Sequence, residues 1–155
     1  MIKVNVNIDD SVFRALMHSF PELKEKANRA AGFVLMDDIA ERFEGEGNPP
    51  TKWTPLQPIT IKRRMKRANG GAIRILNDSG ALKGSFMVGG DDNFFKATQH
   101  KVTVGTKKVY AAPHQWGWKA KNIPARPMIV APNDSPDLKD KLINAYAEVL
   151  RRGLL

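Results

Sequence analysis

The chain has 155 residues and a mass of 17.3 kDa, and 42% of its residues are hydrophobic. This length suffices for one domain with a hydrophobic core, and the mean hydropathy of −0.39 is typical of a globular protein rather than a disordered one. The absence of cysteine excludes disulfides, thiolate metal sites and cysteine nucleophiles. The net charge of +9, from 25 basic and 16 acidic residues, favours polyanions or acidic protein surfaces as partners.

The N-terminal segment from Met1 to Asn7 lacks the long apolar core of a signal peptide. No uninterrupted apolar run approaches the ~20 residues that cross a bilayer. We therefore expect a protein that is made and kept in a cytoplasm, with no membrane contact. Because the sequence has no internal repeat and no long linker, we expect a single domain over residues 1–155.

The first third of the chain predicts a strand and two helices. Apolar and polar residues alternate from Val4 to Ile8, which predicts a half-buried strand, and residues 12–17 suit a short helix. Pro21 is favourable in the first turn of a helix, and apolar residues then recur at helical spacing up to Phe43. This is the longest helix that the sequence predicts.

The middle of the chain predicts loops, short helices and strands. A loop rich in proline and glycine extends from Glu44 to Pro58, and a short basic helix follows from Thr60 to Arg67. Another helical turn is expected around Leu82. Three strands are then predicted, at Ser85–Gly89, Phe94–Thr98 and Lys101–Gly105, and the last two are expected to form a hairpin.

The C-terminal helix has the clearest pattern. Pro136 occupies its expected first turn, and Leu138, Leu142 and Tyr146 lie on one apolar stripe. Together these patterns predict an α+β fold. A small, mostly antiparallel sheet is expected to pack against the long helix of the N-terminal half and the C-terminal helix.

A catalytic role has little support in the sequence. His114 is the candidate base, but no second histidine or paired carboxylate lies at a spacing that would build a reaction centre or a metal site. The alternative is that His114 makes hydrogen bonds within a turn that buries Tyr110 and Trp116. We therefore predict a non-enzymatic protein with no catalytic residues, no metal and no cofactor.

The basic helix raises the possibility of nucleic-acid binding. Its cationic side chains are Lys62, Arg63, Arg64, Lys66 and Arg67. Such residues could contact phosphates, but nucleic-acid recognition also needs stacking aromatic residues or a helix that reads a groove. A solvated face, or contact with an acidic neighbouring subunit, explains the same charges. A basic nucleic-acid-binding module is thus the alternative function.

Five short segments, taken in order, give the chain a family resemblance. They are Trp53-x-Pro55-Leu56, Leu76-x-x-Ser79-Gly80-x-Leu82-x-x-Ser85, Val104-Gly105-Thr106, Tyr110-Ala111-x-x-His114-Gln115-x-Gly117 and Pro124-Ala125-Arg126-Pro127. Over residues 43–128 the sequence resembles the phage virion morphogenesis family, the tail completion proteins of Mu-like phages and prophages. The departures are Ser79 in place of threonine, Pro113 within the turn, and Met128 in place of phenylalanine.

The resemblance implies a structural role in virion assembly, at the tail end or at the head–tail junction, rather than catalysis. The implied partners are other phage tail or head–tail connector proteins, in a homo-oligomer that forms a ring, and DNA contact remains open. The implied location is the host cytoplasm during assembly and then the virion. The residues expected to anchor loops or form the subunit interface are Trp53, Leu56, Tyr110, His114, Trp116, Arg126 and Pro127.

Overall fold

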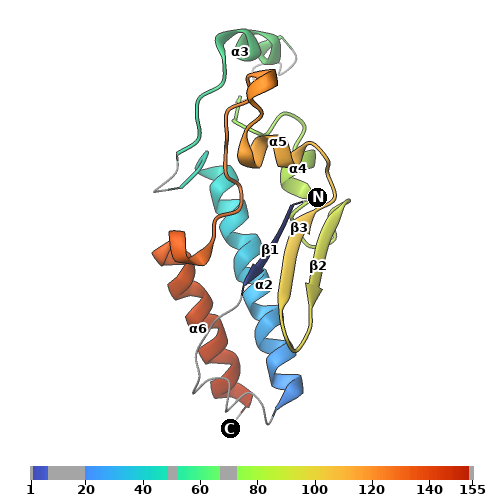
Figure 1. Ribbon diagram of the computed structural model, residues 1–155, viewed down its shortest axis with the longest axis vertical. Coiled ribbons are helices and arrows are strands. Elements are labelled where there is room, and N and C mark those ends of the chain that lie inside the picture. The colour runs from blue at the N-terminus through green and yellow to red at the C-terminus, as the bar shows by residue number, and fades with distance from the viewer. Residues whose placement is uncertain (1, 7–19, 49–51, 67–72, 154–155) are drawn as a thin grey trace.

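The fold is built around one long helix, α2 (Pro21–Glu44), which runs through the middle of the molecule (Figure 1). The computed structural model describes residues 2–6, 20–48, 52–66 and 73–153. The short helix predicted at residues 12–17 lies outside these ranges. Pro21 begins α2, as its position in the sequence predicts, because its missing N–H is one that the first helical turn leaves unbonded.

A three-stranded sheet packs on one side of α2. It consists of β1 (Ile2–Val6), β2 (Asn93–Ala97) and β3 (Val102–Thr106), in the order β1-β3-β2 with both pairs antiparallel. The Thr98 N–H donates to the Lys101 carbonyl at 3.0 Å and closes the β2–β3 hairpin. The predicted hairpin, the antiparallel sheet and the α+β class are therefore confirmed.

A glycine of α2 lets this sheet approach the helix closely. A Cβ added to Gly32 would collide with the side chains of Phe95 on β2 and Val102 on β3. A larger residue at position 32 would force these side chains to shift, so glycine serves close approach here rather than an unusual backbone angle.

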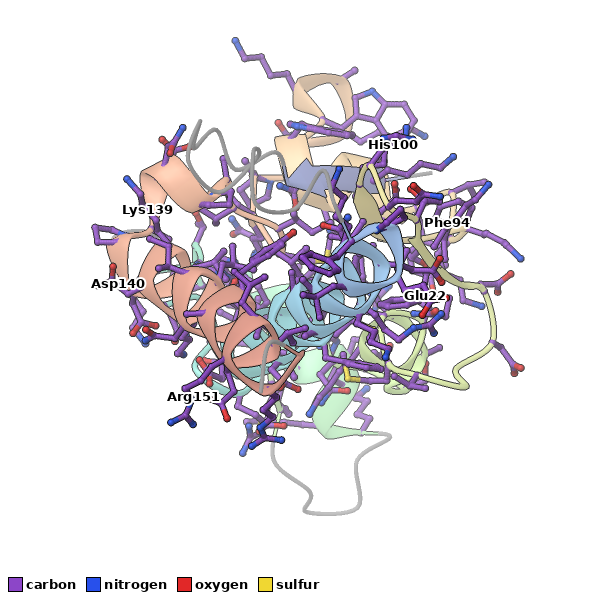
Figure 2. All side chains as sticks on the ribbon, turned by 90° about the horizontal axis from the view of Figure 1, so that it is seen from below. Glu22, Phe94, His100, Lys139, Asp140 and Arg151 are labelled. Carbon is purple, nitrogen blue, oxygen red and sulfur yellow. The ribbon has the colours of Figure 1, made fainter. Side chains whose placement is uncertain are left out.

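The C-terminal helix α6 (Pro136–Gly153) packs along α2, which thus has the sheet on one side and α6 on the other (Figure 1). Leu138, Leu142 and Tyr146 are its buried residues. Viewed along the helices from below, Lys139, Asp140 and Arg151 point outward from α6, away from α2 (Figure 2). This amphipathic arrangement matches the stripe read from the sequence.

Polar contacts join α2 to both of its neighbours. The Tyr146 hydroxyl donates to Asn28 Oδ1, and Asn28 Nδ2 donates to the Thr98 carbonyl at 2.7 Å. Burial raises the pKa of Tyr146 to about 12. On the same helix, the buried Arg42 guanidinium bonds the Asp38 carboxylate at 2.7 Å. We call α2, α6 and the sheet the body of the molecule.

One predicted strand is wrong. Residues 85–89 form successive turns after the short helix α4 (Ala81–Gly84). The N–H groups of Ser85 and Phe86 donate to the carbonyls of Ala81 and Lys83, at 3.1 and 3.0 Å. Because these N–H groups bond locally, they are not available for a strand ladder. The apolar residues here signal the burial of Phe86, which is 0% exposed, rather than an extended chain.

Three further segments form a second region at the end of the molecule opposite the C-terminus (Figure 1). We call residues 52–66, 74–84 and 110–127 the head. It contains α3 (Pro58–Met65), α4, α5 (Ala111–Trp116) and a short 3-10 helix at Lys119–Lys121. A further 3-10 turn, Pro132–Asp134, leads the chain from the head into α6. No helix among the described residues is long and apolar enough to cross a membrane.

Candidate functional site

Trp53 fixes the loop that follows α2. Its side chain is only 4% exposed, and its ring lies edge-on to Phe43 of α2, with ring centroids 5.4 Å apart. Its indole N–H donates to the Pro127 carbonyl at 2.8 Å. One side chain thus attaches the loop both to the body and to a segment more than seventy positions later in the chain. A tryptophan can do this because it combines a large apolar ring with one hydrogen-bond donor.

Arg126 joins the same two segments, but here the later segment supplies the donors and the Trp53 loop supplies the acceptors. Its Nε donates to the Thr54 carbonyl at 2.8 Å and its Nη2 to the Pro55 carbonyl at 3.1 Å. Its backbone N–H donates to the His114 carbonyl at 2.7 Å. The planar guanidinium can meet two adjacent carbonyls at once, as an ammonium group cannot. These carbonyls orient the charge of Arg126 without neutralising it.

Gln115 is an anchoring residue that our sequence reasoning missed. Its Nε2 donates to the Ile129 carbonyl at 2.6 Å, and its Oε1 accepts the N–H groups of Met128 and Ile129, at 2.8 and 3.1 Å. The side chain therefore pairs with the backbone of the segment that returns from the head. The only sign of this role in the sequence was the position of Gln115 in the motif around His114. No spacing pattern distinguishes a buried glutamine from an exposed one.

His114 lies beside two cationic groups and is half-buried. Burial, and then the charges of Arg126 and Arg64, lower its pKa from the ordinary value of 6.5. The imidazole is therefore neutral at pH 7. Its Nδ1 is buried and has no hydrogen-bond partner among the described residues.

Two expected anchors are exposed instead of buried. Trp116 is 66% exposed and Tyr110 43% exposed, so the prediction that the turn at His114 buries them is wrong. The reason is helical geometry. Helix α5 buries Ala111 and Gln115, which lie four positions apart on one face. Trp116 follows Gln115 and so lies off that face, and Tyr110 precedes the helix as its N-cap residue.

The head contains a hollow of about 440 Å³ between α3, α4 and α5. The following residues from the sequence analysis line it: Leu56, Arg63, Arg64, Tyr110, His114 and Arg126. Asp78 and Lys121 contribute the other charged groups. We call this feature the cationic hollow. The structure thus brings together residues from two of the predicted groups, while Trp53, Trp116 and Pro127 lie outside its wall.

The basic cluster of α3 does not act as one surface. Lys62, Arg63 and Lys66 are exposed. Arg64 instead folds inward, where its Nη1 donates to the Arg74 carbonyl at 2.8 Å and its Nε lies 3.4 Å from Asp78 Oδ1. Arg67, the last member of the predicted cluster, lies outside the described residues. The described part of the chain holds no group of three histidine, aspartate or glutamate residues arranged to bind a metal.

These features define an α+β protein whose head is fixed by hydrogen bonds from buried side chains to the backbone. The chain belongs to the phage virion morphogenesis family, whose model matches residues 5–148. That family comprises structural and assembly proteins of phage particles. The resemblance read from the segment around Trp53, Gly80, His114 and Arg126 is therefore confirmed.

The chain is also similar to an uncharacterized protein of the archaeon Methanocaldococcus jannaschii. The two sequences are 31% identical over 129 residues, which is 79% of this chain and 88% of the archaeal protein. No solved structure gives a significant match.

Proposed function

We propose that this protein is a non-enzymatic assembly factor that completes the tail of a phage or prophage particle or joins the tail to the head. Its partners would be other tail or connector proteins, met first in the host cytoplasm and then retained in the virion. Membership of the phage virion morphogenesis family supports the general role. The observation that carries the specific proposal is a fixed head that presents exposed aromatic residues.

We propose that four exposed residues close together in the sequence, three of them aromatic, form one patch, which we call the aromatic patch. They are Val109, Tyr110, Trp116 and Trp118, which are 79%, 43%, 66% and 47% exposed. Tryptophan and tyrosine dominate the binding energy of many protein interfaces, because they bury a large apolar area at a low cost in side-chain entropy. A contiguous surface patch of such residues would be uncommon on a protein that acts alone. A neighbouring subunit that covers this patch accounts for it.

The backbone that carries these residues is held in place before any partner arrives. Gln115 precedes Trp116 and bonds the chain at Ile129, while Arg126 bonds the carbonyl of His114. A preformed surface loses little conformational entropy on binding. We propose homo-oligomerisation in a ring, in which the patch of one subunit meets a different surface of the next, as heterologous contacts require.

The second candidate function is nucleic-acid binding by α3. It is supported by the exposed side chains of Lys62, Arg63 and Lys66 and by the net charge of +9. Such binding would weaken steeply with added salt. Fluorescence anisotropy with a labelled DNA duplex at two salt concentrations tests it. Loss of binding in Arg63→Glu but not in Lys96→Glu, which changes the charge equally on β2, would favour this function.

The main proposal is tested by electron microscopy of particles produced without the gene and then complemented with variants. We expect tailless heads and free tails without the protein, and recovery with the natural sequence. Trp116→Ala should complement poorly although it folds normally, because it removes exposed apolar area. Val88→Ala, at a residue 71% exposed and outside the patch, should complement fully. Normal infectious particles in the absence of the gene would refute the assembly role.

A further inference from the structure

We propose that the cationic hollow receives an aspartate or glutamate side chain from a neighbouring acidic protein of the particle. This inference rests on the proposed assembly function, and it specifies the chemistry of one partner. The hollow would then act as a receptor for one charged residue of that protein.

The first observation is an excess of positive charge around a concave site. Four cationic side chains line the hollow, namely Arg63, Arg64, Lys121 and Arg126. Among the described lining residues, Asp78 is the acidic one. Its ion pair with Arg64 offsets part of the charge, at 3.4 Å. The described lining residues therefore leave an excess of three positive charges, which a carboxylate from a partner would reduce.

The second observation is that Arg126 is built into this wall. Its side chain is 5% exposed, and carbonyl groups of Thr54 and Pro55 hold two of its nitrogens. Its guanidinium is therefore oriented before a ligand arrives. A fixed guanidinium binds a carboxylate more strongly than a mobile side chain does, because less entropy is lost.

The third observation is that like charges face one another across the hollow. The pKa of Arg126 is lowered by burial and then by the charge of Arg64, and the pKa of His114 is lowered by burial and by both arginines. His114 Nδ1 also has no hydrogen-bond partner among the described residues. An anion in the hollow would relieve this repulsion, and sites that store such repulsion are frequently binding sites.

The shape and chemistry of the hollow favour an acidic side chain over a DNA phosphate. Leu56, Leu82, Ile123 and Pro124 contribute apolar wall between the cations. A side chain and its flanking residues can use both kinds of wall. A DNA duplex instead presents phosphates along an extended backbone and favours open cationic surfaces. The excess of cationic side chains around the hollow, in a chain of net charge +9, favours an acidic neighbour as its occupant.

The test uses the full chain and a capped hexaglutamate peptide as the probe, followed by nuclear magnetic resonance. We expect the side-chain signals of His114 and Arg126 to shift, and the pKa of His114 to rise when the peptide binds. The charged or titratable groups that share the hollow with His114 are Arg63, Arg64, Asp78, Tyr110, Lys121 and Arg126. Capped hexaglutamine should produce no such shifts.

Two charge reversals separate specific from general attraction. Arg63→Glu lies on the exposed rim, so it should fold normally and weaken hexaglutamate binding by about tenfold or more. Lys96→Glu changes the net charge equally, but it lies on β2, and it should weaken binding by less than about threefold at moderate salt. Equal losses in the two variants would overturn the proposal, as would the absence of any shift at His114 and Arg126.

Other occupants would also overturn it. A DNA duplex that displaced the peptide and depended on the same residues would assign the hollow to nucleic acid. Self-association of the chain that Arg63→Glu abolished would assign it to a second copy. Failure of this inference is distinguishable from failure of the assembly role. If the gene is needed for complete particles but Arg63→Glu complements fully, the hollow proposal fails and the assembly proposal stands.

Discussion

The body and the head differ in how far they depend on apolar packing and on hydrogen bonds from side chains. In the body, α2 is covered by the sheet and by α6, and the contacts are mainly those of buried apolar residues such as Leu35, Val104 and Leu142. In the head, Trp53, Gln115 and Arg126 donate hydrogen bonds to backbone carbonyls of distant segments. Apolar burial is not directional, whereas a hydrogen bond fixes both distance and angle.

This difference indicates what each region contributes. The body holds most of the buried apolar residues, so we expect it to contribute more than the head to the free energy of folding. The head gains a defined backbone shape from few residues, and that shape positions exposed aromatic and cationic side chains.

The largest effect is expected from Leu142→Ala in α6, whose side chain is 1% exposed. The substitution should lower the free energy of unfolding by about 2–5 kcal/mol, because it removes apolar contact with α2 and leaves a cavity. Urea denaturation followed by circular dichroism measures this. The neighbouring Ile143→Ala, at a residue 45% exposed, is the control and should cost less than about 1 kcal/mol. Equal costs at both positions would contradict the packing of α6.

Gln115→Ala tests the head. It should lower the free energy of unfolding by about 2 kcal/mol, because the N–H groups of Met128 and Ile129 would lose their buried acceptor. Hydrogen exchange should accelerate at those two amides. Gln99→Ala, in the exposed β2–β3 turn, serves as the matched control and should leave stability nearly unchanged. An unchanged exchange rate at residues 128 and 129 would show that Gln115 does not fix this segment.

Arg126→Lys should cost about 1–2 kcal/mol, because one ammonium group cannot reproduce two bonds to adjacent carbonyls. It should also impair particle assembly, since the Trp53 loop would lose its second attachment. Thermal denaturation and complementation measure the two effects. Arg29→Lys on the exposed surface of α2 is the control. Full activity of Arg126→Lys in assembly would mean that the two hydrogen bonds from the planar guanidinium are unimportant.

The smallest effect concerns pH. Because the pKa of His114 is lowered in the folded state, the unfolded chain binds the proton more tightly, and stability falls as the pH decreases through the window below 6.5. Urea midpoints at about pH 7 and about pH 5 should differ less in His114→Gln than in the natural protein. His100→Gln, in the exposed hairpin turn, should not change this difference. If the urea midpoints at the two pH values differed equally in all three proteins, a contribution from His114 would be excluded.

Much of the body could be predicted from the sequence because its signals are local. The stripe Leu138, Leu142 and Tyr146 determines the buried side of α6, and the apolar residues of the hairpin pair across a short turn. The strand predicted at residues 85–89 was wrong because a short apolar run does not distinguish a strand from a buried turn. The segment forms turns because its N–H groups bond the carbonyls of Ala81 and Lys83. The spacing of apolar residues gives no information about such bonds.

The head was less predictable because its contacts are distant in sequence. The residues around Trp53 and Arg126 were singled out through the family resemblance and their chemistry, and their interface role stays a prediction. Gln115 was missed, since nothing local indicates that its amide meets the backbone at Ile129. Conversely, Trp116 was expected to be buried on the basis of its side chain alone, whereas its place on α5 leaves it exposed.

The hydrogen bond between Tyr146 and Asn28 joins two helices that are made at different times on the ribosome. The two residues lie 118 positions apart in the sequence. Because synthesis proceeds at ~5–20 residues per second, α6 is made on the order of ten seconds after α2. During that interval the side of α2 that α6 will cover remains open to other apolar surfaces. The nascent chain is therefore most vulnerable to aggregation or chaperone capture before residue 146 emerges, and completion of α6 ends that exposure.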